Sequence, residues 1–126
     1  MIQYAYNSQI QPPAPFVHVS LRCAESGKEV QDLPAQLDTA ADRTVVPAGV
    51  VDALALVPLD ELPVGGFGGQ VFLLPTFKVD LSIRGLSSQP VEVIGHPEES
   101  FILLGRDVLN AHRIVLDGPR LALEIE

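Results

Sequence analysis

Short stretches with a β-strand pattern recur along the chain. The clearest is 16–23, where apolar and polar residues alternate and the apolar face carries Val17, Val19, Leu21 and Cys23. Five more short strands are expected, at 33–37, 77–84, 91–94, 114–116 and 121–125. The last two flank Asp117-Gly118, which predicts a hairpin. We therefore expect a mostly β domain in which Cys23 is a small core residue.

Other elements follow from apolar runs and the turn residues between them. The run 101–104 is continuously apolar, as expected of a strand buried on both faces. Four glycines surround Phe67 in 65–69, between two apolar runs, which predicts a hairpin tip. Short helices are expected at 47–56, which begins with proline, and at 107–111, with Asp107 as the capping residue.

The first fourteen residues differ from the rest of the chain. They are largely polar and lead into Gln11-Pro12-Pro13-Ala14-Pro15. Because prolines favour an extended backbone, we expect an extended N-terminal arm or linker at 1–14. The remainder, 15–126, is expected to fold as one domain, since the whole chain has only 126 residues.

Composition and charge narrow the function classes. Hydrophobic residues make up 47%, and 8 basic against 16 acidic residues give a net charge of −8. Such a surface repels phosphate backbones and anionic lipid, so we expect neither nucleic acid nor a membrane as a partner. The start of the chain lacks the basic and apolar regions of a secretory signal, and Cys23 is the only cysteine. The expected location is therefore the reducing cytoplasm.

Metal and cofactor sites are not expected. The three histidines, His18, His96 and His112, lack the spacing of metal ligands, and one cysteine builds no thiolate cluster. The Gly-x-Ser-x-Gly motif of serine hydrolases is absent. The glycines at 66–68 are not followed by a helix pattern and so do not indicate a nucleotide site.

The carboxylate at Asp38 is the strongest candidate for chemistry. It directly follows an expected strand and precedes the small residues Thr39, Ala40 and Ala41. A tight turn of this kind can expose a carboxylate in a cleft that a substrate backbone can approach. The alternative is an ordinary turn in which the aspartate only bonds its own backbone.

Three motifs together resemble those of the retropepsins, the retroviral-type aspartic proteases and their cellular and bacterial relatives. The segment 37–46, Leu-Asp-Thr-Ala-Ala-Asp-Arg-Thr-Val-Val, is similar to their active-site loop. The segment 64–69 is similar to their glycine-rich flap, and 102–109 to the hydrophobic-Gly-Arg-Asp segment before their C-terminal helix. The order and spacing also agree, and the resemblance runs from about Pro15 to Ile125.

The resemblance implies a closed, barrel-like retropepsin fold with a flap hairpin and one or two short helices, assembled as a homodimer. It gives Asp38 the catalytic role and Thr39 the role of bracing the two active-site loops. It places Asp42 and Arg106 in an ion pair between the loop and the C-terminal helix. Substrate contacts are implied for Ala40, Asp42, Val45, Gly65, Gly66, Phe67, Gly68, Phe101 and Leu103. For Val45, Phe101 and Leu103 the alternative is a purely structural place in the core.

Two functions are consistent with these residues. The first is an aspartic endopeptidase that hydrolyses peptide or protein substrates with a water activated by Asp38 from two subunits. The second is a retropepsin-like dimerisation or peptide-binding domain with weak or no activity. Ala40 favours the second, because the family usually has glycine there and a methyl group crowds the substrate. The Asp38-Thr39 pair and the glycine-rich segment favour the first.

Overall fold

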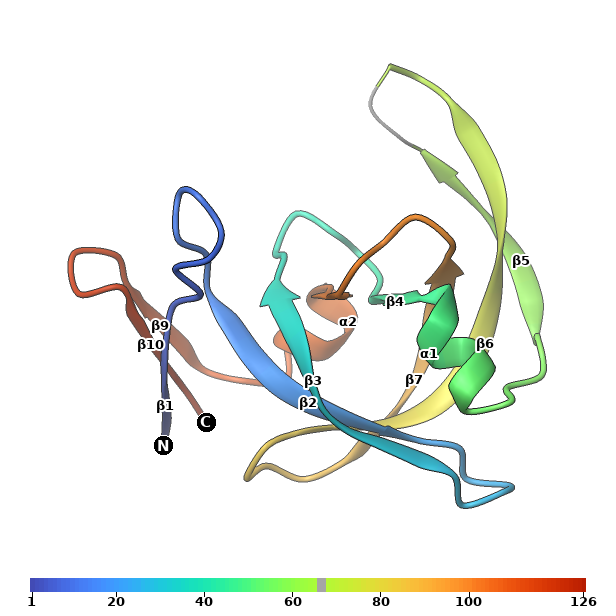
Figure 1. Cartoon of the computed structure of the whole chain (residues 1–126), viewed down its shortest axis with the longest axis horizontal. Helices are drawn as coiled ribbons and strands as arrows, with labels where there is room; N and C mark the ends of the chain where they lie inside the picture. Colours follow the sequence, from blue (N-terminus) through green and yellow to red (C-terminus); the bar gives the residue numbers. More distant parts are fainter. Residues whose placement is uncertain (66–67) are drawn as a thin grey trace.

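Strands dominate the computed structural model, which describes residues 1–65 and 68–126 (Figure 1). The first strands are β1 (Ile2–Ala5), β2 (Phe16–Arg22), β3 (Glu29–Leu37), β4 (Val45–Pro47) and β5 (Asp60–Gly65). They are followed by β6 (Val71–Ile83), β7 (Gln89–His96), β8 (Ile102–Leu104), β9 (Ile114–Asp117) and β10 (Ala122–Ile125). The helices are α1 (Ala48–Ala53) and α2 (Arg106–Leu109).

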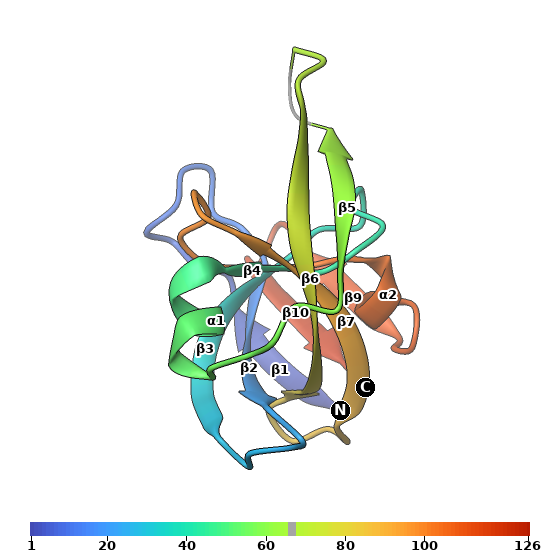
Figure 2. The same cartoon turned by 90° about the vertical axis from the view of Figure 1, so that its right-hand side faces the viewer.

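A six-stranded barrel forms the body of the molecule. Neighbouring strands follow the order β2-β3-β8-β4-β7-β6, and an antiparallel β2–β6 pairing closes the ring. Strand β5 pairs with the first half of β6, so these two strands extend from the barrel as a hairpin (Figure 2). The expectation of a mostly β, closed, barrel-like fold with short helices is confirmed.

The core lies inside the barrel and follows the alternation of the strands. Val17, Val19 and Leu21 of β2 are buried, as are Ile102 and Leu104 of β8. Cys23 is an exception, because it follows the end of β2 and is only half-buried in a turn. A hydrogen bond with Ser26 lowers the pKa of its thiol. The expectation that Cys23 is a core residue was therefore wrong: the strand ends one residue before it.

The two helices are short and begin close to their expected positions. Helix α1 follows Pro47, whose φ of −58° already suits a helix start. Helix α2 is a single turn, and its N-cap is Gly105 and not Asp107. Asp107 lies inside the first turn, where its carboxylate bonds a distant residue described below. Neither helix in the described part of the chain is long or apolar enough to cross a membrane.

The two ends of the chain form a second, three-stranded sheet in the order β1-β10-β9. Ile2 pairs with Ile125 across β1 and β10, and Leu123 and Ile125 are buried. Residues 2–5 of the expected arm are thus extended, but they pair with the C-terminal strand. The reason is a short alternation of Ile2, Tyr4 and Tyr6, which pack against the core. A loop closed by an Asn7–Ala14 bridge leads from β1 into β2.

Candidate active site

Asp38 sits where β3 leaves the barrel. Its backbone N–H still donates to the Leu104 carbonyl of the parallel neighbour β8, at 3.0 Å. The chain then turns tightly: Ala40 N–H donates to Asp38 Oδ1 at 3.2 Å, and Ala41 N–H donates to the Asp38 carbonyl at 3.2 Å. The carboxylate is half-buried and the next two residues are exposed. The local geometry is that of an aspartate turn, and it leaves the carboxylate accessible at the end of a strand.

Helix α2 supports this loop from behind. The Arg106 guanidinium donates from Nη1 to the Thr39 carbonyl at 2.8 Å, and the Arg106 backbone N–H donates to the Ala41 carbonyl at 2.9 Å. Gly105 is in extended conformation, and a Cβ added there would lie 2.5 Å from the Arg43 carbonyl carbon. Only glycine lets the loop approach the helix this closely.

A second connection joins the loop to α2 through Thr44 and Asp107. Thr44 is fully buried, and it donates to Asp107 both from its backbone N–H, at 3.0 Å, and from its hydroxyl, at 2.7 Å. The same hydroxyl accepts the Gly105 N–H at 3.1 Å. The sequence analysis gave neither residue this role. A polar Thr44 at the start of the apolar run Val45-Val46 was the one available signal.

The expected ion pair between Asp42 and Arg106 is not formed. In the part of the chain that the structure describes, no ion pair joins the two residues, and Asp42 is exposed. The Arg106 guanidinium is engaged by the Thr39 carbonyl instead. Asp107, the next residue along the chain, supplies the carboxylate that ties the helix to the loop.

A cavity of about 550 Å³ separates the active-site loop from the hairpin. Its walls are residues 40–43, Val45, residues 62–65 of β5, and Ile94 of β7. Four expected substrate-binding residues therefore line one cavity: Ala40, Asp42, Val45 and Gly65. The loop supplies its polar wall, and the strands supply its apolar walls.

The remaining expected site residues lie elsewhere or outside the described residues. Leu103 is half-buried in β8 and pairs with Val45 in the neighbouring strand. Phe101 packs edge-on against Phe16, with ring centroids 5.0 Å apart. Gly68 is exposed in the turn before β6, with a φ of +89° that favours glycine. Gly66 and Phe67 lie outside the described residues.

Solved structures with a similar fold include viral proteases and a retroviral protease-like domain. The protease of simian foamy virus (mac) aligns with a TM-score of 0.56 at 18% identity, over 76% of this chain and 92% of that one. EIAV protease, solved with the inhibitor HBY-793, aligns with a TM-score of 0.59 at 22% identity, over 86% of this chain and 93% of that chain. The retroviral protease-like domain of Ddi1 from Leishmania major aligns with a TM-score of 0.53 at 14% identity, over 88% of each chain. No protein-family model and no curated protein matches the sequence.

Proposed function

Because the chain has a retropepsin-like fold, we propose that it is an aspartic endopeptidase whose catalytic unit spans residues 15–126. The observation that carries the proposal is the placement of Asp38. Asp38 is half-buried at the end of a barrel strand and begins a loop that α2 holds, and residues 40–43 of that loop line the cavity beneath the β5–β6 hairpin. Because viral proteases are among the solved structures with this fold, peptide hydrolysis is the leading candidate function.

The proposed chemistry needs two copies of the chain. An aspartic protease uses one ionised carboxylate to take a proton from water and one protonated carboxylate to polarise the scissile carbonyl. The sequence contains a single Asp-Thr-Ala-Ala motif. Asp38 of one subunit therefore meets Asp38 of the other across a two-fold axis, in an interface that uses the same surface of both. Strand β10 already pairs with β1 and β9 and buries Leu123 and Ile125 within the subunit, so it leaves no free strand edge for that interface.

The walls of the cavity are suited to this reaction. One side of the cavity has little capacity to hydrate a charge, because it is formed by Val45, Ile94 and the apolar residues of β5. A peptide held there between loop and hairpin loses water, and the electrostatic interactions of the carboxylates are then stronger. The β5–β6 hairpin takes the role of the flap, with Gly65 at the end of β5 and Gly68 in the turn before β6. The sequence analysis gave Gly66 and Phe67 the same role, and both lie outside the described residues. Thr39 braces the paired loops.

The second candidate is a retropepsin-like domain that dimerises or binds peptides without efficient cleavage, and Ala40 is the observation that favours it. The Ala40 N–H orients the catalytic carboxylate, and Ala40 lines the cavity. A methyl group at this position narrows the space where a substrate backbone would pass.

A peptide-library assay separates the two functions. The endopeptidase proposal predicts cleavage that the transition-state mimic pepstatin blocks and that Asp38→Asn abolishes. The Asn side chain keeps the shape of Asp but cannot serve as a base. Asp52→Asn, an exposed carboxylate on α1, is the matched control and should cleave normally. Peptide binding without cleavage by the parent would support the second candidate, and unchanged cleavage by Asp38→Asn would exclude the proposed mechanism.

We also propose a reducing cytoplasmic location. It rests on the single cysteine, which the structure shows as a free, half-buried thiol. A folded, active dimer that needs no oxidant, found in the cytosolic fraction of cells, is the expected result. Recovery from an oxidising compartment, as a disulfide-linked dimer through Cys23, would contradict it.

A further inference from the structure

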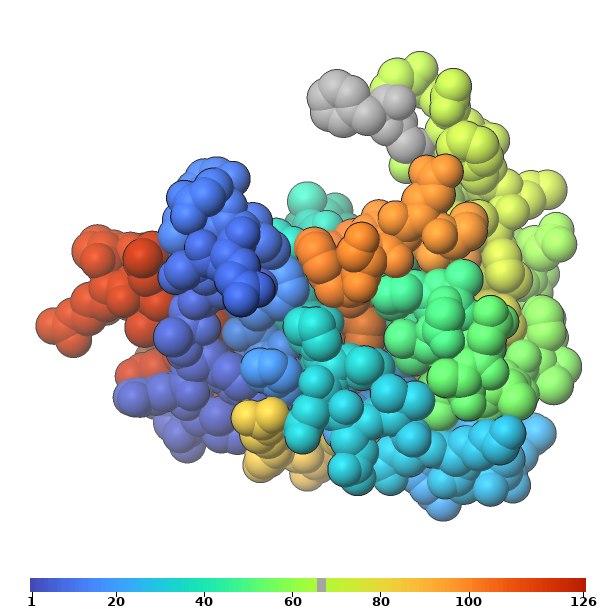
Figure 3. All heavy atoms as spheres, in the orientation of Figure 1, coloured from blue at the N-terminus to red at the C-terminus, as the bar shows by residue number. Residues whose placement is uncertain are grey.

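The C-terminal hairpin has a strand edge that no other strand covers in the part of the chain that the structure describes. Strand β9 pairs with β10 along one side only, since the order of the sheet is β1-β10-β9. Figure 3 shows this hairpin, in red, at one end of the molecule. The edge is apolar at its centre, where Val115 is 38% exposed and Leu116 is 52% exposed. An exposed apolar edge of this kind is a template for pairing with another chain.

The backbone groups available at this edge belong to Ile114 and Leu116. Next to them, Arg113 exchanges both backbone hydrogen bonds with Glu126, each at 3.1 Å. Hydrogen-bonded and non-bonded positions alternate along an antiparallel pair, and the register of β9 with β10 is regular. Residues 115 and 117 therefore direct their N–H and C=O groups toward β10, whereas Ile114 and Leu116 direct theirs to the open edge.

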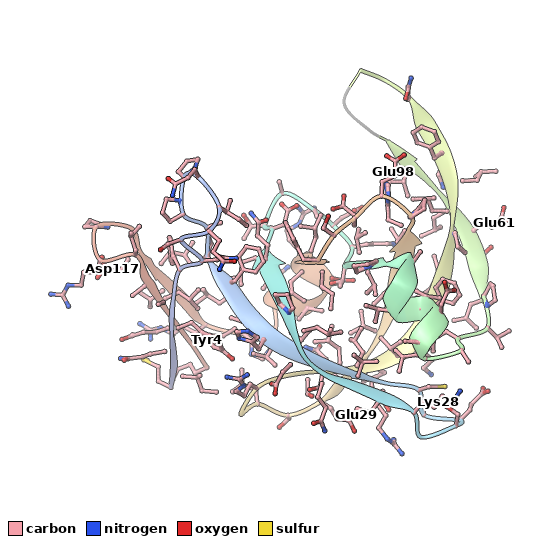
Figure 4. All side chains as sticks on the ribbon, in the orientation of Figure 1. Tyr4, Lys28, Glu29, Glu61, Glu98 and Asp117 are labelled. Atoms are coloured by element: carbon pink, nitrogen blue, oxygen red, sulfur yellow. The ribbon has the colours of Figure 1, made fainter. Side chains whose placement is uncertain are left out.

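The side chains along the strand are complementary to a second copy of the same strand. Residues 113–117 read Arg-Ile-Val-Leu-Asp, with a cation before three apolar residues and an anion after them. Antiparallel pairing of two copies centred on Val115 sets Arg113 of each copy opposite Asp117 of the other. Each has an ion-pair partner in its own chain, but the Arg113 side chain stays 66% exposed and that of Asp117 40% exposed. Figure 4 labels Asp117 where β9 runs into the turn of the hairpin.

We propose that β9 is the strand edge through which two copies of this chain pair. In the register centred on Val115, Ile114 of one copy lies opposite Leu116 of the other, so residues with open backbone groups exchange hydrogen bonds. A shift by one residue would set these open groups opposite groups that already bond β10. The pairing also covers the exposed side chain of Leu116 with Ile114 of the other copy.

This pairing supplies the second copy that the proposed mechanism needs, and to that extent it rests on the proposed function. A closed dimer has a single two-fold axis, so the β9 pair and the pair of Asp38 carboxylates both lie on it. The sheet runs β1-β10-β9 in one copy and continues as β9-β10-β1 in the other. Strand β10 stays inside this sheet, in agreement with its buried residues Leu123 and Ile125.

Cysteine cross-linking tests the register. Cys23, the only cysteine, is first removed by Cys23→Ser, and Val115→Cys or Leu116→Cys is then added. Directly opposite residues in an antiparallel pair lie within the Cα distance that a disulfide spans. We expect Val115→Cys to form a covalent dimer at least about ten-fold faster than Leu116→Cys, although Leu116 is the more exposed position. Val57→Cys, at a 74% exposed position between α1 and β5, should stay monomeric on a non-reducing gel.

Charge reversal tests the same pairing without a new thiol. Arg113→Asp places like charges opposite each other, and the dissociation constant of the dimer, measured by sedimentation equilibrium, should rise at least about five-fold. Adding Asp117→Arg restores opposite charges across the pair, and the constant should return to within about two-fold of the parent value. Lys28→Asp makes the same change in net charge at an exposed turn, far from Asp117 in Figure 4, and should leave the constant unchanged.

The outcomes separate this pairing from the proposed function, because neither readout needs cleavage. Cross-linking at Val115→Cys in a chain that cleaves no peptide would support the pairing and contradict the proposed function. A cleaving dimer that cross-links equally fast at Leu116→Cys, or whose dissociation constant ignores Arg113→Asp, would overturn the pairing and leave the proposed function standing. A parent chain that stays monomeric at high micromolar concentration would overturn the pairing as well.

Discussion

At the residue scale, the methyl group of Ala40 is the point where this chain departs from the proteases that its loop resembles. The Ala40 N–H bond to Asp38 needs only the backbone, whereas the side chain borders the cavity. We predict that Ala40→Gly leaves peptide-cleavage activity unchanged or raises it, through a lower KM, because more room is available to the substrate. Ala41→Gly, in the same loop and cavity wall, is the control for added backbone freedom. A ten-fold fall in kcat/KM for Ala40→Gly at unchanged stability would show that the methyl group is needed.

Asp107 supports the second prediction at this scale. It accepts two hydrogen bonds from the fully buried Thr44, one of them at 2.7 Å. Asp107→Ala leaves a buried N–H and a buried hydroxyl without this acceptor, and we expect a loss of about 1–3 kcal/mol of unfolding free energy in urea. Asp52→Ala, on an exposed position of α1, should lose much less. Equal stability of the two variants would mean that Asp107 does not hold the loop.

At the element scale, the approach of α2 to the active-site loop depends on Gly105. A Cβ at this position would meet three backbone atoms of Arg43 within 2.9 Å, so loop and helix must separate. We predict that Gly105→Ala lowers the unfolding free energy by about 2–4 kcal/mol, within the range for overpacked sites, and reduces activity. Gly49→Ala is the matched control: its Cβ would meet nothing within 4 Å, and it lies in α1. That change should stabilise the protein by about 0.5–1 kcal/mol. A Gly105→Ala variant as stable as the parent would contradict the close contact.

The elements differ in how much of them a sequence reveals. Alternation was enough for β2 and contributed to the C-terminal hairpin, because burial on one face imposes a period on those residues. A continuous apolar run predicted β8, but Leu103 is only half-buried, so the expected burial on both faces is incomplete. The three-residue strand β4 carries no such period, and its two neighbours come from distant parts of the chain. The same limit applies to the bond between Thr44 and Asp107, which lie 63 residues apart. The sequence analysis placed β1 in an extended arm because the prolines that follow it are a clear local signal. The pairing of its four residues with β10 depends on the other end of the chain and leaves no such signal.

At the scale of the whole molecule, the barrel and the hairpin account for one half of the proposed active site. The resemblance of three motifs indicated the fold, and the structures of viral proteases agree with it. The loop, the cavity and the hairpin then lie together in one chain. In the proposed mechanism the second carboxylate comes from another copy, so the proposed function rests on an assembly and not on a single subunit.

Mixing subunits tests this central claim most directly. Parent chain is refolded together with Asp38→Asn chain at varied ratios and constant total concentration, and the initial rate of peptide cleavage is measured. If each active site needs Asp38 from both subunits, activity follows the square of the parent fraction, and an equal mixture retains about one quarter of the parent rate. Chains mixed only after folding, before subunits exchange, serve as the control and should retain about one half. A linear dependence in the co-refolded samples, with about one half of the rate in the equal mixture, would show that one chain acts alone and would contradict the shared pair of Asp38 carboxylates.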